Sequence, residues 1–275
     1  MPTIKTGDIN TYYEVHGQGA PVLLIAGTGS SHHGWMMETV PRLSPHFQVI
    51  VYDLRGTGET DKPDIPYSMR MFAKDAADLL DGLGITEPAH VAGHSMGGRI
   101  AQWLALDYPE KVRSLVLACS GPGRYDDFRP EPGIPLKHAL EMIEKGYEGY
   151  RRYYATCEFM FPKEFSSTHP ELMRKMEEKA IQENTPAKMY LRHIIARQAH
   201  DTLDLLPRIS APTLVLEGAK DDVVRGTGNH VRSSQVLAEK IPGARFELIP
   251  GCAHAVFQQE PELVHQLMID FCNAH

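Results

Sequence analysis

The chain has 275 residues, 42% of them hydrophobic, with 28 Lys and Arg against 35 Asp and Glu and a formal net charge of −7. A chain of this length can bury a substantial core as one or two domains. The acidic balance argues against nucleic acid as a partner, because phosphate binding needs a basic face. No stretch approaches 18 consecutive apolar residues, so we also expect no membrane span.

The four cysteines, Cys119, Cys157, Cys252 and Cys272, form no C-x-x-C pair, which excludes the usual zinc-knuckle and thioredoxin-like motifs. The N-terminal residues lack the charged and apolar regions of a secretory signal. Scattered cysteines without an export signal are typical of a reducing compartment. We therefore expect free thiols, a cytoplasmic location and no bound metal.

In the first part of the chain, short apolar runs alternate with segments of helical spacing. The runs indicate strands buried on both faces, and the spaced segments indicate amphipathic helices. Alternation of this kind predicts a mostly parallel sheet with helices on both faces. The predicted strands cover residues 9–16, 22–26, 47–52, 89–92 and 112–118, and the predicted helices cover residues 69–83 and 96–106.

The pattern changes after residue 123. No buried strand is evident over residues 124–206, where prolines separate predicted helices over residues 136–145, 148–159, 170–183 and 187–199. Strands over residues 213–217 and 245–249 then alternate with helices over residues 233–241 and 261–272. We predict a core domain formed by residues 1–123 and 208–275, and a helical cap domain formed by residues 124–207.

The central motif is G-H-S-M-G-G at residues 93–98, between a predicted strand and a predicted helix. A G-x-S-x-G in that setting is typical of a nucleophile elbow, where glycines permit a tight turn and the serine is exposed at the end of the strand. The following helix points its first N–H groups at the reacting centre. Ser95 is therefore the candidate nucleophile, with a glycine-rich connection as the alternative interpretation.

A serine hydroxyl needs a base to remove its proton. His254 follows the last predicted strand, on a loop at the same edge of the sheet. A carboxylate must orient that imidazole, and the loop after the preceding strand offers Asp221 and, as the alternative acid, Asp222. The order Ser95, Asp221, His254 is that of α/β-hydrolases, not that of the chymotrypsin or subtilisin folds.

The developing oxyanion needs preorganised donors. The backbone N–H of Met96, directly after the nucleophile, should supply one of them. We expect the second from the glycine-rich loop at residues 26–31, with Thr28 as the donor. A loop without a catalytic role is the alternative.

Over nearly its whole length the sequence resembles the α/β-hydrolase superfamily. The resemblance rests on five motifs in order: A-G-T-G at residues 26–29, Y-D-L-R-G-T-G at 52–58, G-H-S-M-G-G at 93–98, G-A-K-D at 218–221 and G-C-A-H at 251–254. Members commonly have His-Gly where this chain has Ala26-Gly27. Within the superfamily the chain is similar to serine esterases and lactonases of the 3-oxoadipate enol-lactonase type. That similarity implies an eight-stranded α/β-hydrolase fold with a helical cap between strands 6 and 7.

Motifs and resemblance together predict a hydrolase that cleaves a carboxylic ester or lactone through an acyl-enzyme on Ser95, without a cofactor. Activity should fall as His254 is protonated below about pH 6 to 7. The same triad also serves carbon–carbon bond hydrolases of aromatic degradation and cofactor-free perhydrolases, and a non-catalytic small-molecule receptor is a third interpretation. A dinucleotide site is disfavoured, because His32 stands where the fingerprint needs glycine or alanine. The choice between a monomer and a homo-oligomer stays open.

The predicted cap is rich in large apolar side chains. Helical spacing predicts that many of them pack in the core, while the remainder line an apolar acyl or aromatic pocket above Ser95. The set comprises Tyr147, Tyr150, Tyr153, Tyr154, Phe159, Met160, Phe161 and Phe165.

Overall fold

The computed structural model describes residues 2–126, 128–221 and 230–275. Its centre is an eight-stranded sheet in the order β1-β2-β4-β3-β5-β6-β7-β8. The first two pairings, β1 with β2 and β2 with β4, are antiparallel, and the remaining ones are parallel, as predicted. The strands are β1 (Thr3–Thr6), β2 (Ile9–His16), β3 (Pro21–Ile25), β4 (Gln48–Tyr52), β5 (Ala89–His94), β6 (Val112–Ala118), β7 (Thr213–Gly218) and β8 (Arg245–Ile249).

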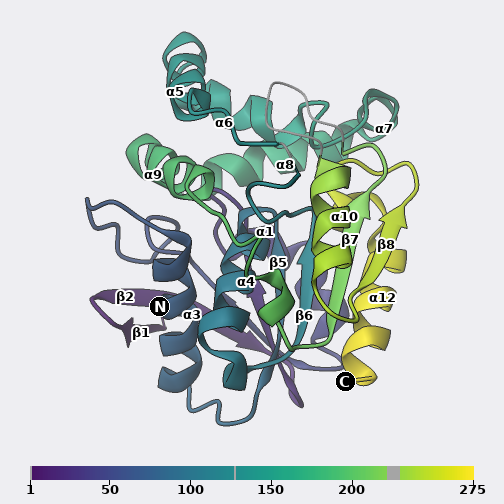
Figure 1. Cartoon of the computed structure of the whole chain (residues 1–275). Helices are drawn as coiled ribbons and strands as arrows, with labels where there is room; N and C mark the ends of the chain where they lie inside the picture. The colour runs from purple at the N-terminus through teal and green to yellow at the C-terminus, as the bar shows by residue number, and fades with distance from the viewer. Residues whose placement is uncertain (1, 127, 222–229) are drawn as a thin grey trace.

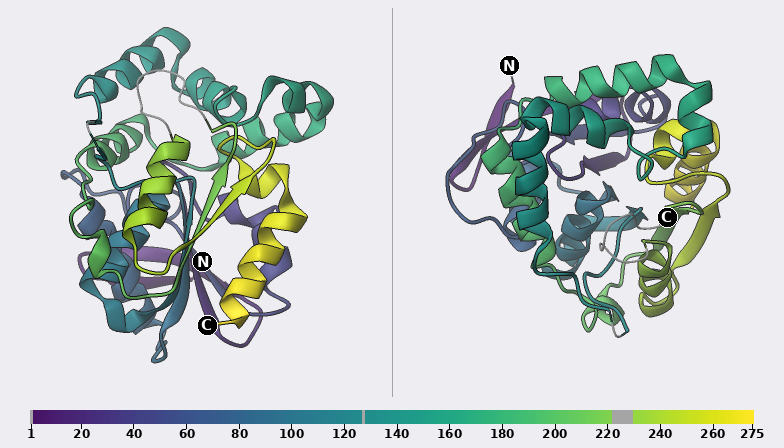
Figure 2. Two further views of the ribbon diagram at one scale, coloured as in Figure 1. Left: turned by 45° about the vertical axis from the view of Figure 1, so that its right-hand side comes forward. Right: turned by 90° about the horizontal axis from the view of Figure 1, so that it is seen from above.

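Helices cover both faces of the sheet (Figure 1). The turned view in Figure 2 shows α10 and α12 on opposite sides of it. Because β3 and β7 are buried along their whole length, their side chains pack into both layers. One layer comprises α3 (Met69–Gly82), α4 (Met96–Asp107) and α10 (His230–Lys240), and the other comprises α1 (His33–Met36), α2 (Thr39–Leu43), α11 (Val256–Gln259) and α12 (Pro261–Asn273).

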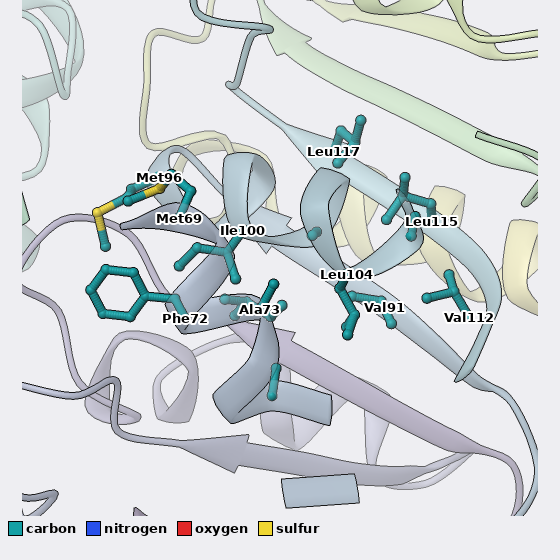
Figure 3. Close-up of a cluster of buried hydrophobic side chains, with 14 of the residues drawn as sticks. Met69, Phe72, Ala73, Val91, Met96, Ile100, Leu104, Val112, Leu115 and Leu117 are labelled. Atoms are coloured by element: carbon teal, nitrogen blue, oxygen red, sulfur yellow. The ribbon is translucent and has the colours of Figure 1, made fainter. Parts of the chain in front are cut away.

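Apolar packing between α3, α4 and the sheet supports the turn that carries Ser95. Figure 3 shows Phe72 of α3, Ile100 and Leu104 of α4, and Val91 of β5 in one cluster, and all four are fully buried. Burying side chains of this size contributes about 1.5–3 kcal/mol each. This cluster holds α4 against β5, and therefore holds the short turn between them.

A helical segment separates β6 from β7 in the sequence, as predicted, and lies over the carboxyl ends of the strands (Figure 1). One apolar cluster, around Tyr150 and Ile194, lies within this segment, and a second, around Phe161 and Met176, also contains Ala255 from the loop after β8. The separation of the segment as a domain of its own stays a prediction. The helices of this inserted segment are α5 (Ile134–Lys145), α6 (Tyr147–Thr156), α7 (Lys163–Thr168), α8 (Pro170–Gln182) and α9 (Ala187–Gln198).

Several short elements are not predicted from the sequence, namely β1, α1, α2, α7 and α11, each of four to six residues. Helices of this length are too short to show a helical period, and β1 is a four-residue strand at the edge of the sheet. β5 also continues to His94, two residues beyond the predicted strand. The four cysteines form no disulfide, as predicted. Within the described residues, no helix is long and apolar enough to cross a membrane.

Candidate active site

The turn between β5 and α4 holds Ser95 in a left-handed backbone conformation with φ of 56°. Residues other than glycine rarely adopt this conformation, and such strain clusters at functional sites. The neighbouring glycines leave no room for side chains. A Cβ on Gly93 would lie 2.3 Å from the Gly97 carbonyl oxygen, and one on Gly97 would lie 2.0 Å from the Ile25 carbonyl oxygen. The turn therefore has the close backbone approach expected of a nucleophile elbow.

Hydrogen bonds tie this turn to the end of β6. The Ser95 backbone N–H donates to the Ala118 carbonyl at 2.8 Å. The Ser120 hydroxyl donates to the Ser95 carbonyl at 2.9 Å. These bonds use only the backbone of Ser95, so its hydroxyl takes no part in holding the turn.

His254 and Asp221 are in direct contact. The Nδ1–H of His254 donates to Oδ2 of Asp221 at 2.6 Å, and both side chains are buried. A bond at Nδ1 leaves Nε2 as the basic nitrogen, which is the tautomer a catalytic histidine needs. The alternative acid Asp222 lies outside the described residues.

Ser95, Thr28 and His254 line one cavity of about 410 Å³. A Cβ on Gly27 would lie 3.5 Å from the Ser95 Cβ, so the predicted oxyanion loop is beside the candidate nucleophile. Met96 begins α4, which places its N–H directly after Ser95. In the described part of the chain no hydrogen bond joins the Ser95 hydroxyl to His254. Bonds of this kind are often long before substrate binds.

Contacts from two directions hold the His254 loop. The ring of Phe159 stacks on that of His254, with centroids 4.3 Å apart and planes 30° apart. The His254 backbone N–H donates to the Phe159 carbonyl at 3.2 Å. On the other side, Nε2–H of His94 donates to the His254 carbonyl at 2.9 Å. The loop is therefore tied both to the turn that carries Ser95 and to the inserted segment.

Burial lowers the pKa of His254 below its usual value, and the positive charges of Arg197 and Arg99 lower this pKa further. The carboxylate of Asp221 favours the charged imidazole and opposes that shift. The expectation that activity falls below about pH 6 to 7 assumes an ordinary imidazole. Burial and the two arginines favour an acid limb at lower pH than an ordinary imidazole would give, and the position of the limb stays a prediction.

Three further polar side chains lie at this site that the sequence analysis does not name. His230 begins α10, and its Nδ1 lies 3.7 Å from Oδ2 of Asp221. Arg99 and Arg197 line the same cavity as Ser95. Of these, only Arg99 has a sequence signal, because it follows Ser95 by one helical turn. His230 and Arg197 come from distant segments of the chain, and only the fold brings them to this site.

Glu217, at the end of β7, is a fully buried acid close to Asp221. The Ser234 hydroxyl lies 2.5 Å from Oε2 of Glu217 and 2.7 Å from the Ser120 carbonyl oxygen. A hydroxyl has one proton, so an ionised Glu217 would compete with the Ser120 carbonyl oxygen for it, whereas a neutral Glu217 could donate to the Ser234 oxygen. Burial and the negative charge of Asp221 also raise the pKa of Glu217 well above its usual value. The contact geometry and the raised pKa both favour the neutral form of Glu217.

Asp221, His230 and His254 each place one potential metal ligand atom within 4.8 Å of the others. The hydrogen bond between His254 and Asp221 already accounts for the placement of two of these side chains. We assign no metal to this group, and the expected absence of a metal stays a prediction.

The large apolar side chains of the inserted segment divide between its core and the cavity, as expected. Tyr150 and Phe161 are fully buried in apolar clusters. The side chains of this set that line the cavity are Tyr153, Tyr154, Phe159 and Met160.

Known proteins resemble this chain over nearly its whole length. A family model described as the alpha/beta hydrolase fold matches residues 20–261. A protein of Azorhizobium caulinodans named "Putative carbamate hydrolase RutD" is 35% identical over 272 residues, covering 99% of this chain and 98% of its own length.

Solved structures show the same similarity. The enol-lactonase from Burkholderia xenovorans LB400 superposes with a TM-score of 0.85 at 22% identity, covering 99% of this chain and 100% of its own chain. This similarity is one of fold. Est816, described as an N-acyl homoserine lactone degrading enzyme, has a TM-score of 0.80 at 28% identity and covers 98% of this chain and 100% of its own.

Proposed function

The chain belongs to the α/β-hydrolase family, and on that basis we propose that it is a serine hydrolase that cleaves a carboxylic ester or lactone. One observation carries the proposal: the hydrogen-bonded pair of His254 and Asp221 lies at the cavity that Ser95 lines. The strained backbone of Ser95 supports its role as nucleophile.

In the proposed reaction His254 takes the proton of Ser95 as the serine oxygen attacks the substrate carbonyl carbon. The negative charge that develops on the carbonyl oxygen is stabilised by the N–H groups of Met96 and Thr28, each worth about 3 kcal/mol in comparable enzymes. The alcohol leaves with the proton that His254 returns to it. Water then attacks the acyl-enzyme by the same route and regenerates Ser95.

A carbamate is a second candidate substrate, because the relative from Azorhizobium caulinodans bears the name of a carbamate hydrolase. A carbamate presents the same kind of carbonyl carbon to Ser95. Attack would form a carbamoyl-enzyme and release an alcohol. Nitrogen donates electrons to that carbonyl, so we expect slower hydrolysis of the carbamoyl-enzyme than of an acyl-enzyme.

The test is a panel of 4-nitrophenyl esters, lactones and an aryl carbamate, with a fluorophosphonate label to identify the nucleophile. We expect ester turnover by the wild type, a label on Ser95, and loss of both in Ser95→Ala. Ser210→Ala, on the exposed surface, is the matched control and should behave as the wild type.

Full ester turnover by Ser95→Ala would overturn the proposed mechanism. Release of a carboxylate and a ketone-derived fragment from a dienone, with poor ester turnover, would favour a carbon–carbon bond hydrolase. Tight binding of a small molecule without any turnover would favour a receptor.

A further inference from the structure

The cavity beside Ser95 is positively charged, although the chain as a whole carries a net charge of −7. Among the residues that line it, Lys and Arg outnumber Asp and Glu by five to two. A cavity lined by one sign of charge concentrates ligands of the opposite sign. The protein therefore has an anion-attracting site inside an acidic molecule.

Two of these cations already have partners. Lys179 Nζ lies 3.2 Å from Oε1 of Glu183. Arg151 donates to the Tyr147 hydroxyl at 3.2 Å and lies over the Tyr190 ring, 5.0 Å from its centroid. Neither side chain needs a further ligand to account for its position.

Arg99 and Arg197 differ from them. Nη1 of Arg99 donates to the Arg197 carbonyl at 2.7 Å, and Nη1 of Arg197 donates to the Thr28 hydroxyl at 3.3 Å. Neither forms an ion pair with any carboxylate that the structure describes. A guanidinium has five N–H donors, so most donors of this pair remain available within the cavity.

The two guanidinium groups also repel each other. Burial, together with the positive charge of Arg197, lowers the pKa of Arg99 to about 9. Like charges close together in a desolvated site are unfavourable. An anion bound between them would remove this cost and would also use their remaining donors.

On the basis of the proposed function, we propose that Arg99 and Arg197 form a carboxylate-binding subsite, and that the acyl part of the substrate carries a carboxylate. Arg99 follows Ser95 by four residues, about 6 Å along the axis of α4, and Arg197 contacts Thr28 of the oxyanion loop. A carboxylate held there would lie a few bonds from the carbonyl carbon that Ser95 attacks. The planar guanidinium matches a carboxylate through two parallel hydrogen bonds.

The assignment to the acyl part follows from the proposed role of His254. The departing oxygen must leave beside His254, which protonates it. The side of the cavity next to Thr28, where Arg197 lies, is then available to the acyl group.

The experiment compares two esters that differ by one group. Mono-4-nitrophenyl glutarate carries a carboxylate where 4-nitrophenyl pentanoate carries a methyl group, and spontaneous hydrolysis is subtracted for both. We expect the wild type to favour the glutarate ester in kcat/KM by about tenfold or more, as for other hydrogen bonds to charged groups. In Arg99→Gln and in Arg197→Gln this preference should fall at least severalfold, with Arg197→Lys retaining part of it.

The ratio of the kcat/KM values for the two esters is taken within each variant, so that a general loss of activity cancels. Arg192→Gln is the matched control: Arg192 is on the same helix, α9, but pairs with Asp64 outside the cavity. It should keep the wild-type ratio.

A second measurement is the pH profile. The charges of Arg99 and Arg197 lower the pKa of His254, and a bound carboxylate would offset them. With the glutarate ester the acid limb of kcat should therefore lie at higher pH than that of kcat/KM. With the pentanoate ester the two limbs should differ less, because this substrate adds no charge.

The outcomes separate this inference from the proposed function. A wild type that hydrolyses both esters without preference, or a preference unchanged in both arginine variants, would overturn the carboxylate subsite and leave the hydrolase intact. If neither ester is hydrolysed, the proposed function fails. Calorimetric titration with glutarate then tests the subsite separately. If the subsite exists, Arg197→Gln binds glutarate more weakly than the wild type and Arg192→Gln do.

Discussion

The ring of Phe159 lies 4.3 Å from the ring of His254, with the two planes 30° apart. Phe159 belongs to the inserted segment between β6 and β7, whereas His254 follows β8. The inserted segment therefore covers the candidate base and helps to keep water from it. Since desolvation disfavours the imidazolium, the pKa of His254 depends on a side chain almost a hundred residues earlier in the chain.

Replacing Phe159 should move the pH dependence of catalysis. In Phe159→Ala, water reaches His254 and stabilises its charged form, so the pKa of His254 rises toward its usual value of about 6.5. The acid limb of kcat/KM should shift to higher pH, measured with a neutral 4-nitrophenyl ester. Phe165→Ala is the control, because Phe165 stacks on Phe161 and His169 away from the cavity. Identical pH profiles for both variants would contradict this role of Phe159.

Asp221→Asn should lower kcat by about three to four orders of magnitude, because an amide stabilises the wrong tautomer of the histidine. The fold should be retained, since the side chain keeps its shape. Stopped-flow or steady-state ester hydrolysis measures the loss, and Asp222→Asn is the parallel variant. A larger loss in Asp222→Asn would make Asp222 the acid.

Gly93→Ala should destabilise the protein as well as inactivate it. The new methyl group would lie 2.3 Å from the Gly97 carbonyl oxygen, a backbone contact that cannot relax through a rotamer change. We expect a loss of at least about 3 kcal/mol, which for a chain of this size corresponds to a fall in melting temperature of roughly 6 to 12 °C. Gly133→Ala, where the methyl group would meet no atom within 4 Å, should melt within about a degree of the wild type. Equal melting temperatures would show that the turn tolerates a side chain.

Glu217→Gln should stabilise the protein at neutral and alkaline pH. Burial raises the pKa of Glu217 in the folded state, so the folded state holds this proton to higher pH than the unfolded state, which releases it above about pH 4.5. Wild-type stability therefore decreases as pH rises through this interval, by up to about 1.4 kcal/mol per pH unit. Glutamine keeps the hydrogen bonds without this penalty.

Urea unfolding at several pH values measures the effect. The advantage of Glu217→Gln should grow with pH and vanish below about pH 4.5. Glu110→Gln, at an exposed position, should show no such trend. Parallel curves for Glu217→Gln and the wild type would mean that Glu217 is ionised in the folded state.

Much of the fold is predictable from local sequence. β2, β6 and β8 have the predicted bounds, because each is a continuous or alternating apolar run with turn residues near its ends. The bounds of α7 were beyond prediction, because one and a half turns carry no measurable period. Elements of that length depend on the surface against which they pack.

Local sequence patterns are sufficient to predict the turn that carries Ser95 and the chain order of Ser95, Asp221 and His254. Close backbone approach selects glycine at Gly93, where the contact is with Gly97 of the same turn, and at Gly97, where the contact is with the Ile25 carbonyl oxygen of β3. The environment of these groups depends on the tertiary structure. The fold brought Phe159 onto His254, buried Glu217 near Asp221, and left Arg99 and Arg197 in one cavity without a described carboxylate partner. Desolvation and charge depend on which distant segments meet in space, and no local pattern in the chain records that.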